Sequence, residues 1–228
     1  MTRQQVFRMS VDCSMTILSI VLMGGNFIFQ ATSVHEILGT LLFPIWAIHI
    51  FLNRLWYASL FKGKYNSYRI MQSIINCGIL ICVIFLVISG IMLSHHVFAF
   101  LGINFGIGFA RLSHLMSSHW YLLFMSLHIG LHINLIANRI LSKRNVRIEN
   151  QKKFSPSKVI LAIVCIYGTY AFISRGIWKY LILKQHFFFM NIEKGLILFF
   201  VDYVAIIVLF ATLAHFTAKA LKWQKKTD

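Results

Sequence analysis

The stretch HEILGTLLFPIWAIH, residues 35–49, is almost entirely apolar, yet a histidine stands at each end. Ionisable side chains at membrane depth are expensive, and they mark functional sites by default. The two histidines are 14 residues apart. At about 100° per residue this spacing comes within roughly 40° of whole turns, so both rings lie on one helix face, about 21 Å apart along the axis. The stretch therefore predicts a membrane helix with two histidines on one face.

The composition of the whole chain supports a membrane protein. Of 228 residues, 58% are hydrophobic and only 12% are charged, and the mean hydropathy is +0.74. A soluble domain of this length needs more charge to cover its surface. Six apolar segments are each about 20 residues or longer, enough to cross a hydrocarbon core of about 30 Å. They are residues 11–31, 34–57, 70–98, 111–140, 157–183 and 195–221.

We therefore predict an all-α integral membrane protein with six transmembrane helices, the first four of which form a haem-binding bundle. In this division residues 1–145 are a dihaem cytochrome b four-helix bundle, and residues 146–228 are two additional transmembrane helices. The division rests on the position of the histidines described below, which lie mainly in the first four segments.

The distribution of basic residues predicts the orientation. The net charge is +16, but most lysines and arginines lie in short loops between apolar segments, which argues against nucleic acid as a partner. Of the 22 lysines and arginines, 17 belong to the two chain ends and the connections after the second and fourth segments. The five on the other side are Arg111, Arg175, Lys179, Lys184 and Lys194. By the positive-inside rule both termini are cytoplasmic.

The fourth segment repeats the histidine spacing of the second. His114 and His128 are also 14 residues apart. Segments two and four run in the same direction because one span separates them, so His35 and His114 lie near the outer surface and His49 and His128 near the cytoplasmic one. Two facing imidazoles are suitable axial ligands for one haem iron. A single intramembrane histidine is explained by a hydrogen bond in the core, whereas four at matched spacing favour two haem sites.

The partner of His49 has an alternative. His132 lies one turn beyond His128 and faces the same way. Three interpretations of His132 are open: it is the ligand in place of His128, it contacts a haem propionate, or it binds a quinone. Pro44 keeps this alternative open, because a proline inside a helix usually kinks it and turns one histidine relative to the other.

Five further residues are candidates for cofactor binding. Gly39 and Gly130 lie near ligand positions, where a missing side chain lets a porphyrin approach, or where two helices pack closely. His95 and His96 end the third segment at the outer side, as alternative ligands or a proton relay. Arg111 precedes His114 by three residues, where it binds a haem propionate or reaches the membrane interface.

The local sequences carry a family resemblance. Two parallel helices, each with His-x13-His, resemble the dihaem cytochrome b subunit of quinol–cytochrome c reductases. The motifs HEILG, HIFLNRLW and RLSHLMSSHWYLLFMSLHIGLH resemble the flavinylation-associated membrane cytochrome b domain over about residues 30–140. The resemblance implies two b haems, with quinone as a further ligand. It also implies electron transfer across the bacterial cytoplasmic membrane, between the quinone pool or an inner donor and an extracytoplasmic flavoprotein or other redox partner.

Two other classes compete with electron transfer. A transporter for protons or metal ions also uses intramembrane histidines, but buried acids normally accompany such a path, and Asp202 is the one clear mid-span acid. Arg175 is expected at the same depth, so the two predict a structural ion pair. A purely structural membrane anchor leaves the matched histidines unexplained. Of enzymatic activities, quinol oxidation is the one that fits this class.

Overall fold

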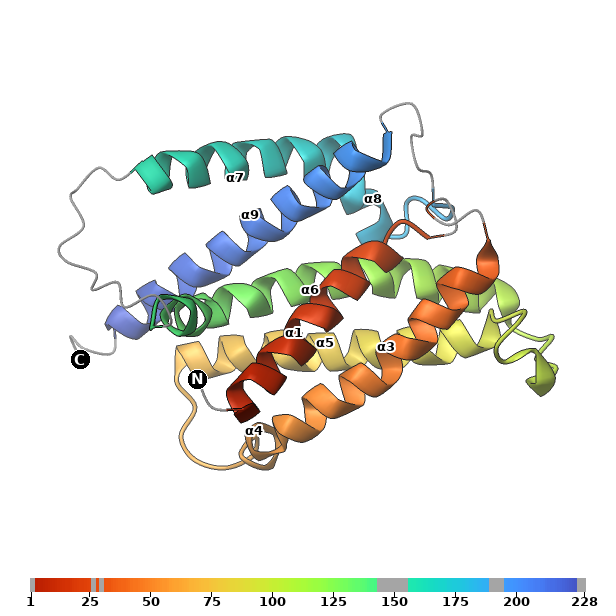
Figure 1. The fold of residues 1–228 in the computed structure, drawn as a ribbon, viewed down its shortest axis with the longest axis horizontal. Coiled ribbons are helices and arrows are strands. Elements are labelled where there is room, and N and C mark those ends of the chain that lie inside the picture. Colours follow the sequence, from red (N-terminus) through yellow and green to blue (C-terminus); the bar gives the residue numbers. More distant parts are fainter. Residues whose placement is uncertain (1–2, 26–27, 29–30, 143–155, 189–194, 225–228) are drawn as a thin grey trace.

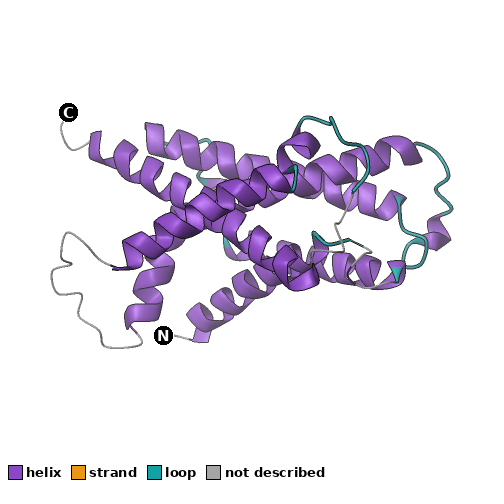
Figure 2. Ribbon diagram, turned by 90° about the horizontal axis from the view of Figure 1, so that it is seen from above, coloured by secondary structure: helices purple, strands orange, loops and turns teal. Residues whose placement is uncertain are grey.

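The computed structural model describes residues 3–25, 28, 31–142, 156–188 and 195–224, and every regular element in these ranges is a helix (Figures 1 and 2). The α-helices are α1 (Arg3–Leu22), α3 (Thr32–Leu52), α4 (Arg54–Ala58), α5 (Ser67–Met92), α6 (Ile107–Ser142), α7 (Pro156–Ser174), α8 (Ile177–Leu181) and α9 (Gly195–Gln224). A short 3-10 helix, η1 (Ala99–Leu101), lies between α5 and α6.

Six of the described helices, α1, α3, α5, α6, α7 and α9, are long and apolar enough to cross a membrane. The predicted all-α fold is confirmed, and the six long apolar helices suggest a multi-pass membrane protein. The outward face of α5 is suited to lipid, since Ile74, Ile81 and Ile88 each expose more than half of their surface. Each of these isoleucines is seven residues from the next, so they form one apolar stripe along the helix.

Helix boundaries differ from the predicted ones where glycine intervenes. The first helix is α1, residues 3–22 rather than 11–31, and Gly25 beyond it has φ +56°. The fifth ends at Ser174 rather than near residue 183, and Gly176 has φ +64° before α8 begins. Left-handed backbone of this kind interrupts a helix, and glycine adopts it at little cost. Hydropathy alone detects the apolar run and misses these breaks.

Helix α6 is the centre of the bundle. It packs against α5 and α9, and α7 packs against α9, while α1 pairs with α3 (Figure 1). One hydrophobic core contains Tyr121 of α6 together with Phe199 and Tyr203 of α9. The core thus continues from the first four long helices into the last two, across the predicted division at residue 145, which itself lies outside the described residues. The start of α1 and the end of α9 lie toward the same end of the bundle (Figure 1).

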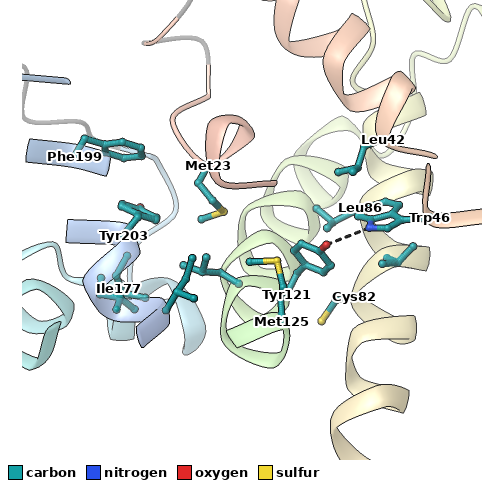
Figure 3. Packing of buried hydrophobic residues seen from close by; sticks show 14 of the residues in the cluster. Met23, Leu42, Trp46, Cys82, Leu86, Tyr121, Met125, Ile177, Phe199 and Tyr203 are labelled. Atoms are coloured by element: carbon teal, nitrogen blue, oxygen red, sulfur yellow. Dashed lines mark hydrogen bonds between the residues drawn. The ribbon is translucent and has the colours of Figure 1, made fainter. Parts of the chain in front are cut away.

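Helix α3 stands apart from α5 and α6, with only sparse contact to α5. Large side chains bridge the space between them. The indole Nε1–H of Trp46 donates to the hydroxyl of Tyr121 at 3.1 Å (Figure 3). That hydroxyl also lies 3.1 Å from Ser19 Oγ of α1. All three side chains are buried. The histidines of α3 and α6 lie in this same space, His35 and His114 on one side of the bridge formed by Trp46 and Tyr121, and His49 and His128 on the other.

Candidate functional site

The structure brings together the histidines that the spacing paired. The rings of His35 and His114 have centroids 6.3 Å apart and planes at 68°. The rings of His49 and His128 have centroids 6.4 Å apart and planes at 74°. We name His49 and His128 the near pair, because it lies toward the chain termini, and His35 and His114 the far pair. Two helices thus present two equivalent imidazole pairs at two depths.

These separations suit two imidazoles on opposite sides of one metal. A metal–nitrogen bond is about 2 Å long and each ring centre lies roughly 1 Å beyond its nitrogen, so two rings in line have centroids about 6 Å apart. Both planes contain the common axis at any rotation about it, so the observed interplanar angles are compatible with axial ligation. The separations of 6.3 and 6.4 Å therefore fit a metal that is held from both sides.

In the near pair, both rings have a hydrogen-bond partner on Nδ1. His49 Nδ1 lies 2.8 Å from Asp12 Oδ1 of α1, and His128 Nδ1 lies 2.8 Å from Asn76 Oδ1 of α5. A carboxylate and an amide oxygen are acceptors, so each ring carries its proton on Nδ1 and leaves the lone pair on Nε2. Metal-bound histidines are usually oriented in this way, by a partner on the nitrogen that does not bind the metal.

The far pair has weaker partners. His114 Nδ1 lies 3.0 Å from Ser89 Oγ of α5. The Nδ1 of His35 is buried and has no hydrogen-bond partner. A buried polar atom without a partner is unfavourable. The far pair is thus less fully satisfied by the protein itself than the near pair.

A cavity of about 400 Å³ adjoins the far pair and is lined by both of its histidines, Gly39 and Arg111. A Cβ added to Gly39 meets nothing within 4 Å. Gly39 therefore borders open space rather than a neighbouring helix, and it lies one turn from His35. Arg111, an exposed residue, supplies a cation at the same cavity. The volume of the cavity lies within the usual range for small-molecule sites.

Gly130 has a different role from Gly39. A Cβ there lies 2.1 Å from the carbonyl oxygen of Ala211, so α6 and α9 are in backbone contact at this point. Of the two alternatives for Gly130, the geometry supports helix packing.

His132 lies beside His128, with ring centroids 4.7 Å apart. It is the ring of His128 that stands at ligand separation from that of His49. Pro44 lies inside α3, which continues without a break from Thr32 to Leu52. The proline therefore does not separate His49 from the partner that the spacing predicts.

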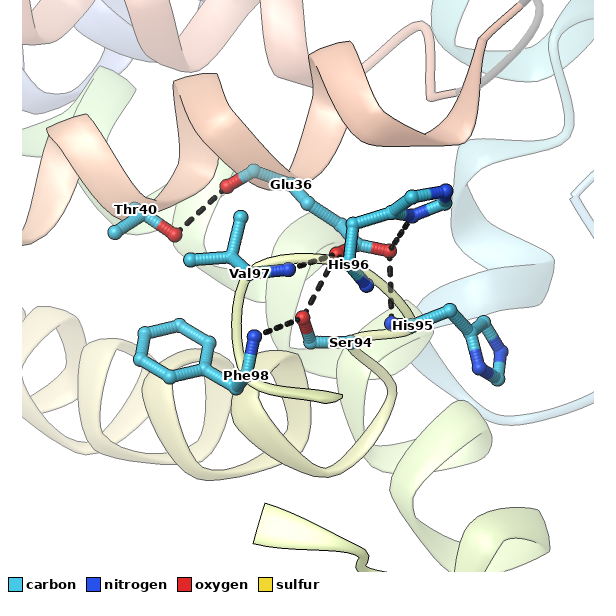
Figure 4. Close-up of polar contacts among 7 residues, drawn as sticks. All are labelled: Glu36, Thr40, Ser94, His95, His96, Val97 and Phe98. Carbon is cyan, nitrogen blue, oxygen red and sulfur yellow. Dashed lines mark hydrogen bonds and ion pairs between the residues drawn. The ribbon is translucent and has the colours of Figure 1, made fainter. Parts of the chain in front are cut away.

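His95 and His96 belong to a polar clasp rather than to a histidine pair (Figure 4). The Glu36 carboxylate accepts hydrogen bonds from the backbone amides of His95, His96 and Val97 at 2.9–3.1 Å and from Ser94 Oγ at 2.7 Å. His96 Nδ1 also lies 3.2 Å from this carboxylate. Both histidine residues are exposed. The clasp fastens the start of α3 to the turn after α5.

Two further ionisable groups inside the bundle, Arg175 and His119, each have a partner within the protein for one nitrogen, while Arg175 Nη2 and His119 Nε2 are buried without one. Arg175 Nε donates to Asp202 at 2.7 Å, and both side chains are buried, which confirms the predicted ion pair. His119 is buried, stacks on Tyr180 with centroids 4.2 Å apart, and donates from Nδ1 to the carbonyl of Leu115. It lines the same cavity as His35 and His114.

Sequence reasoning missed the residues that orient the histidines. Asp12, Asn76 and Ser89 lie on α1 and α5, far from their partners along the chain. For Asp12 a signal exists, because an acid inside an apolar segment is rare and functional by default. For Asn76 and Ser89 the sequence offers no comparable signal, since both residue types are common inside membrane helices.

No family model, curated protein or solved structure matches the chain. The class is therefore defined by the fold: a multi-pass helical membrane protein with paired intramembrane histidines. In the described part of the chain, no three His, Cys, Asp or Glu side chains gather as a metal-ion site. Sites with two protein ligands suit a metal whose remaining positions are filled by a cofactor ring.

Proposed function

We propose that this protein is a dihaem b-type cytochrome that carries electrons across a membrane. One observation carries the proposal: two histidine pairs, separated from each other by 14 residues along both α3 and α6, have ring centroids 6.3 and 6.4 Å apart. Two matched separations at two depths favour one shared role for both pairs. The hydrogen bonds on three of the four Nδ1 atoms, and the cavity with its bare glycine at the far pair, add support.

The residues of the chain have defined roles in this proposal. The near pair, His49 and His128, would hold one haem, and the far pair, His35 and His114, would hold the other. A haem held between two histidines supplies reversible one-electron transfer, and its filled coordination excludes oxygen chemistry at the metal. Asp12, Asn76 and Ser89 hold the rings in place through Nδ1. Arg111 offers a cation for a propionate at the far site.

The same proposal assigns the protein to the bacterial cytoplasmic membrane with both termini inside. Its support is the excess of lysine and arginine on the terminal side and the resemblance to flavinylation-associated cytochromes. The near pair is then close to the cytoplasmic face and the far pair close to the outer face. Electrons pass between the quinone pool or an inner-side donor and an outer acceptor, with an FMN-bearing protein as the proposed partner.

The test is haem stoichiometry. The full chain, expressed with ample haem supply and purified in detergent, is expected to give a b-type pyridine haemochrome with two haems per chain. His35→Ala and His49→Ala are each expected to lose one haem. Absence of haem from the folded wild-type protein contradicts the proposal and turns attention to proton or metal transport.

Double substitutions test the pairing itself. His35→Ala/His114→Ala removes both members of one pair and is expected to lose one haem, as either single variant does. His35→Ala/His49→Ala removes one member from each pair and is expected to lose both haems. His215→Ala is the matched control, because His215 lies on α9, where its ring contacts Phe216, and both haems are expected to stay. Equal loss from the two double variants contradicts the pairing.

A further inference from the structure

The near pair and the far pair differ in the groups that hold their rings. In the near pair His49 faces the carboxylate of Asp12 and His128 faces the amide oxygen of Asn76, both at 2.8 Å. In the far pair His114 faces the hydroxyl of Ser89 at 3.0 Å, and His35 Nδ1 has no partner. The difference is therefore one of charge, since one pair has an anion hydrogen-bonded to a ligand ring and the other has none.

A carboxylate on Nδ1 changes the ligand's chemistry as well as its orientation. The Nδ1–H bond to an anion is charge-assisted and about twice as strong as a bond to a neutral acceptor. It makes the other nitrogen, Nε2, a stronger electron donor to a metal. A more electron-rich ligand stabilises the oxidised metal over the reduced one, so the reduction potential of that site falls.

We propose that Asp12 is a positioning residue that separates the two haem sites in reduction potential, with the near site the lower of the two. This inference rests on the proposed dihaem function and deepens it, because it gives the direction of electron flow. With haem bound, one electron at a time would pass from the near site to the far site and on to an outer acceptor. A quinol on the near side would re-reduce the near site in two successive one-electron steps and release two protons as it becomes quinone.

The charges around the far pair do not cancel this difference. Glu36 and Arg111 both line the cavity there, and they contribute one charge of each sign. The Glu36 carboxylate is bound to the turn after α5 by hydrogen bonds from three backbone amides and Ser94. The electrostatic asymmetry between the sites therefore comes from Asp12.

The size of the effect follows from exposure. The Asp12 side chain is 48% exposed and that of His49 22%, so surroundings screen part of the charge. We expect Asp12→Asn to increase the equilibrium constant for reduction of the near site about tenfold. For one electron this raises the reduction potential by about 59 mV. The variant keeps the oxygen that accepts from Nδ1, so the ring keeps its orientation while the charge is lost.

The experiment is a spectroelectrochemical titration of the full, haem-loaded chain. The His35→Ala background isolates the near site, and the His49→Ala background isolates the far site. Asp12→Asn is expected to raise the near potential and to leave the far potential unchanged, and Asp12→Glu to restore most of the wild-type value. Asp202→Asn is the matched control, because that carboxylate binds Arg175 rather than a histidine, and both potentials are expected to stay.

Asn76→Asp provides the opposite test. It places a second carboxylate on the near pair, at His128, and is expected to lower the reduction potential of the near site. This variant tests the effect of charge even if Asp12→Asn fails to hold its haem. The inference is overturned if the equilibrium constant for reduction of the near site changes less than twofold in both variants. It is also overturned if the wild-type near site has a higher reduction potential than the far site. Two haems with unchanged potentials refute only this inference, whereas absence of haem refutes the proposed function.

Discussion

The near pair and the far pair have the same spacing, ring separation and helices, but different surroundings. The far pair opens on a cavity of about 400 Å³ bordered by Gly39, and it depends on the Glu36 clasp for its position. The near pair is held by hydrogen bonds from α1 and α5 to both of its rings. The comparison teaches that a sequence repeat specifies equivalent ligands, whereas neighbouring helices make the two sites chemically different.

The largest expected effect comes from filling the far cavity. Gly39→Phe places a large ring in the open space beside His35, so we expect loss of the far haem and about half of the total haem. The fold is expected to survive, because no atom beyond the adjacent residues and the neighbouring backbone of α3 lies within 4 Å of the new Cβ. Haem per chain and the elution profile in detergent measure both results. Loss of the near haem instead would show that the cavity belongs to another site.

Releasing the clasp is expected to have the next largest effect. Glu36→Ala removes the acceptor of three backbone amides and the Ser94 hydroxyl, and we expect unfolding free energy to fall by about 2 kcal/mol. Haem binding at the far pair is expected to weaken, because His35 adjoins the lost anchor. Thermal melting with a haem count measures the change. Glu36→Gln keeps an acceptor oxygen and is the control, with a smaller loss.

Removing the hydrogen bond between Trp46 and Tyr121, which lies between the two histidine pairs, is expected to affect haem binding at both pairs equally. Tyr121 lies seven residues from His114 and seven from His128. Tyr121→Phe leaves the buried Trp46 N–H without its acceptor, and we expect a loss of about 1–2 kcal/mol in stability. Two haems per chain are expected to remain, as measured by haemochrome after chemical or thermal challenge of matched samples. Selective loss of one haem would place this tyrosine in one site.

The smallest expected effect is at Ser89. Ser89→Ala removes a neutral hydrogen bond to His114, so the far potential is expected to shift by less than the near potential does in Asp12→Asn. Redox titration of both variants under one buffer gives the comparison. Ser126→Ala is the control, because Ser126 is buried and bonds the carbonyl of Leu122 rather than a histidine. A larger shift at Ser89 than at Asp12 contradicts the proposed role of charge.

The sequence predicts the ligands better than their surroundings. His35, His49, His114 and His128 could be paired because helical periodicity turns a 14-residue spacing into one face. Gly39 and Gly130 looked alike in sequence, yet one borders open space and the other touches Ala211 of α9. Nothing local distinguishes them, since the difference depends on which helix lies opposite. His95 and His96 were likewise placed at the correct end, but the sequence did not reveal that Glu36 binds them.

The amino-acid sequence by itself determined six apolar helices, the charge distribution along the chain and two matched histidine spacings, because these depend on local composition and on the fixed geometry of the α-helix. Only the tertiary structure decided that α3 stands apart from α6 with two imidazole pairs between them, and that Asp12 meets His49. Those features depend on contacts between helices distant along the chain, which periodicity within one helix does not encode.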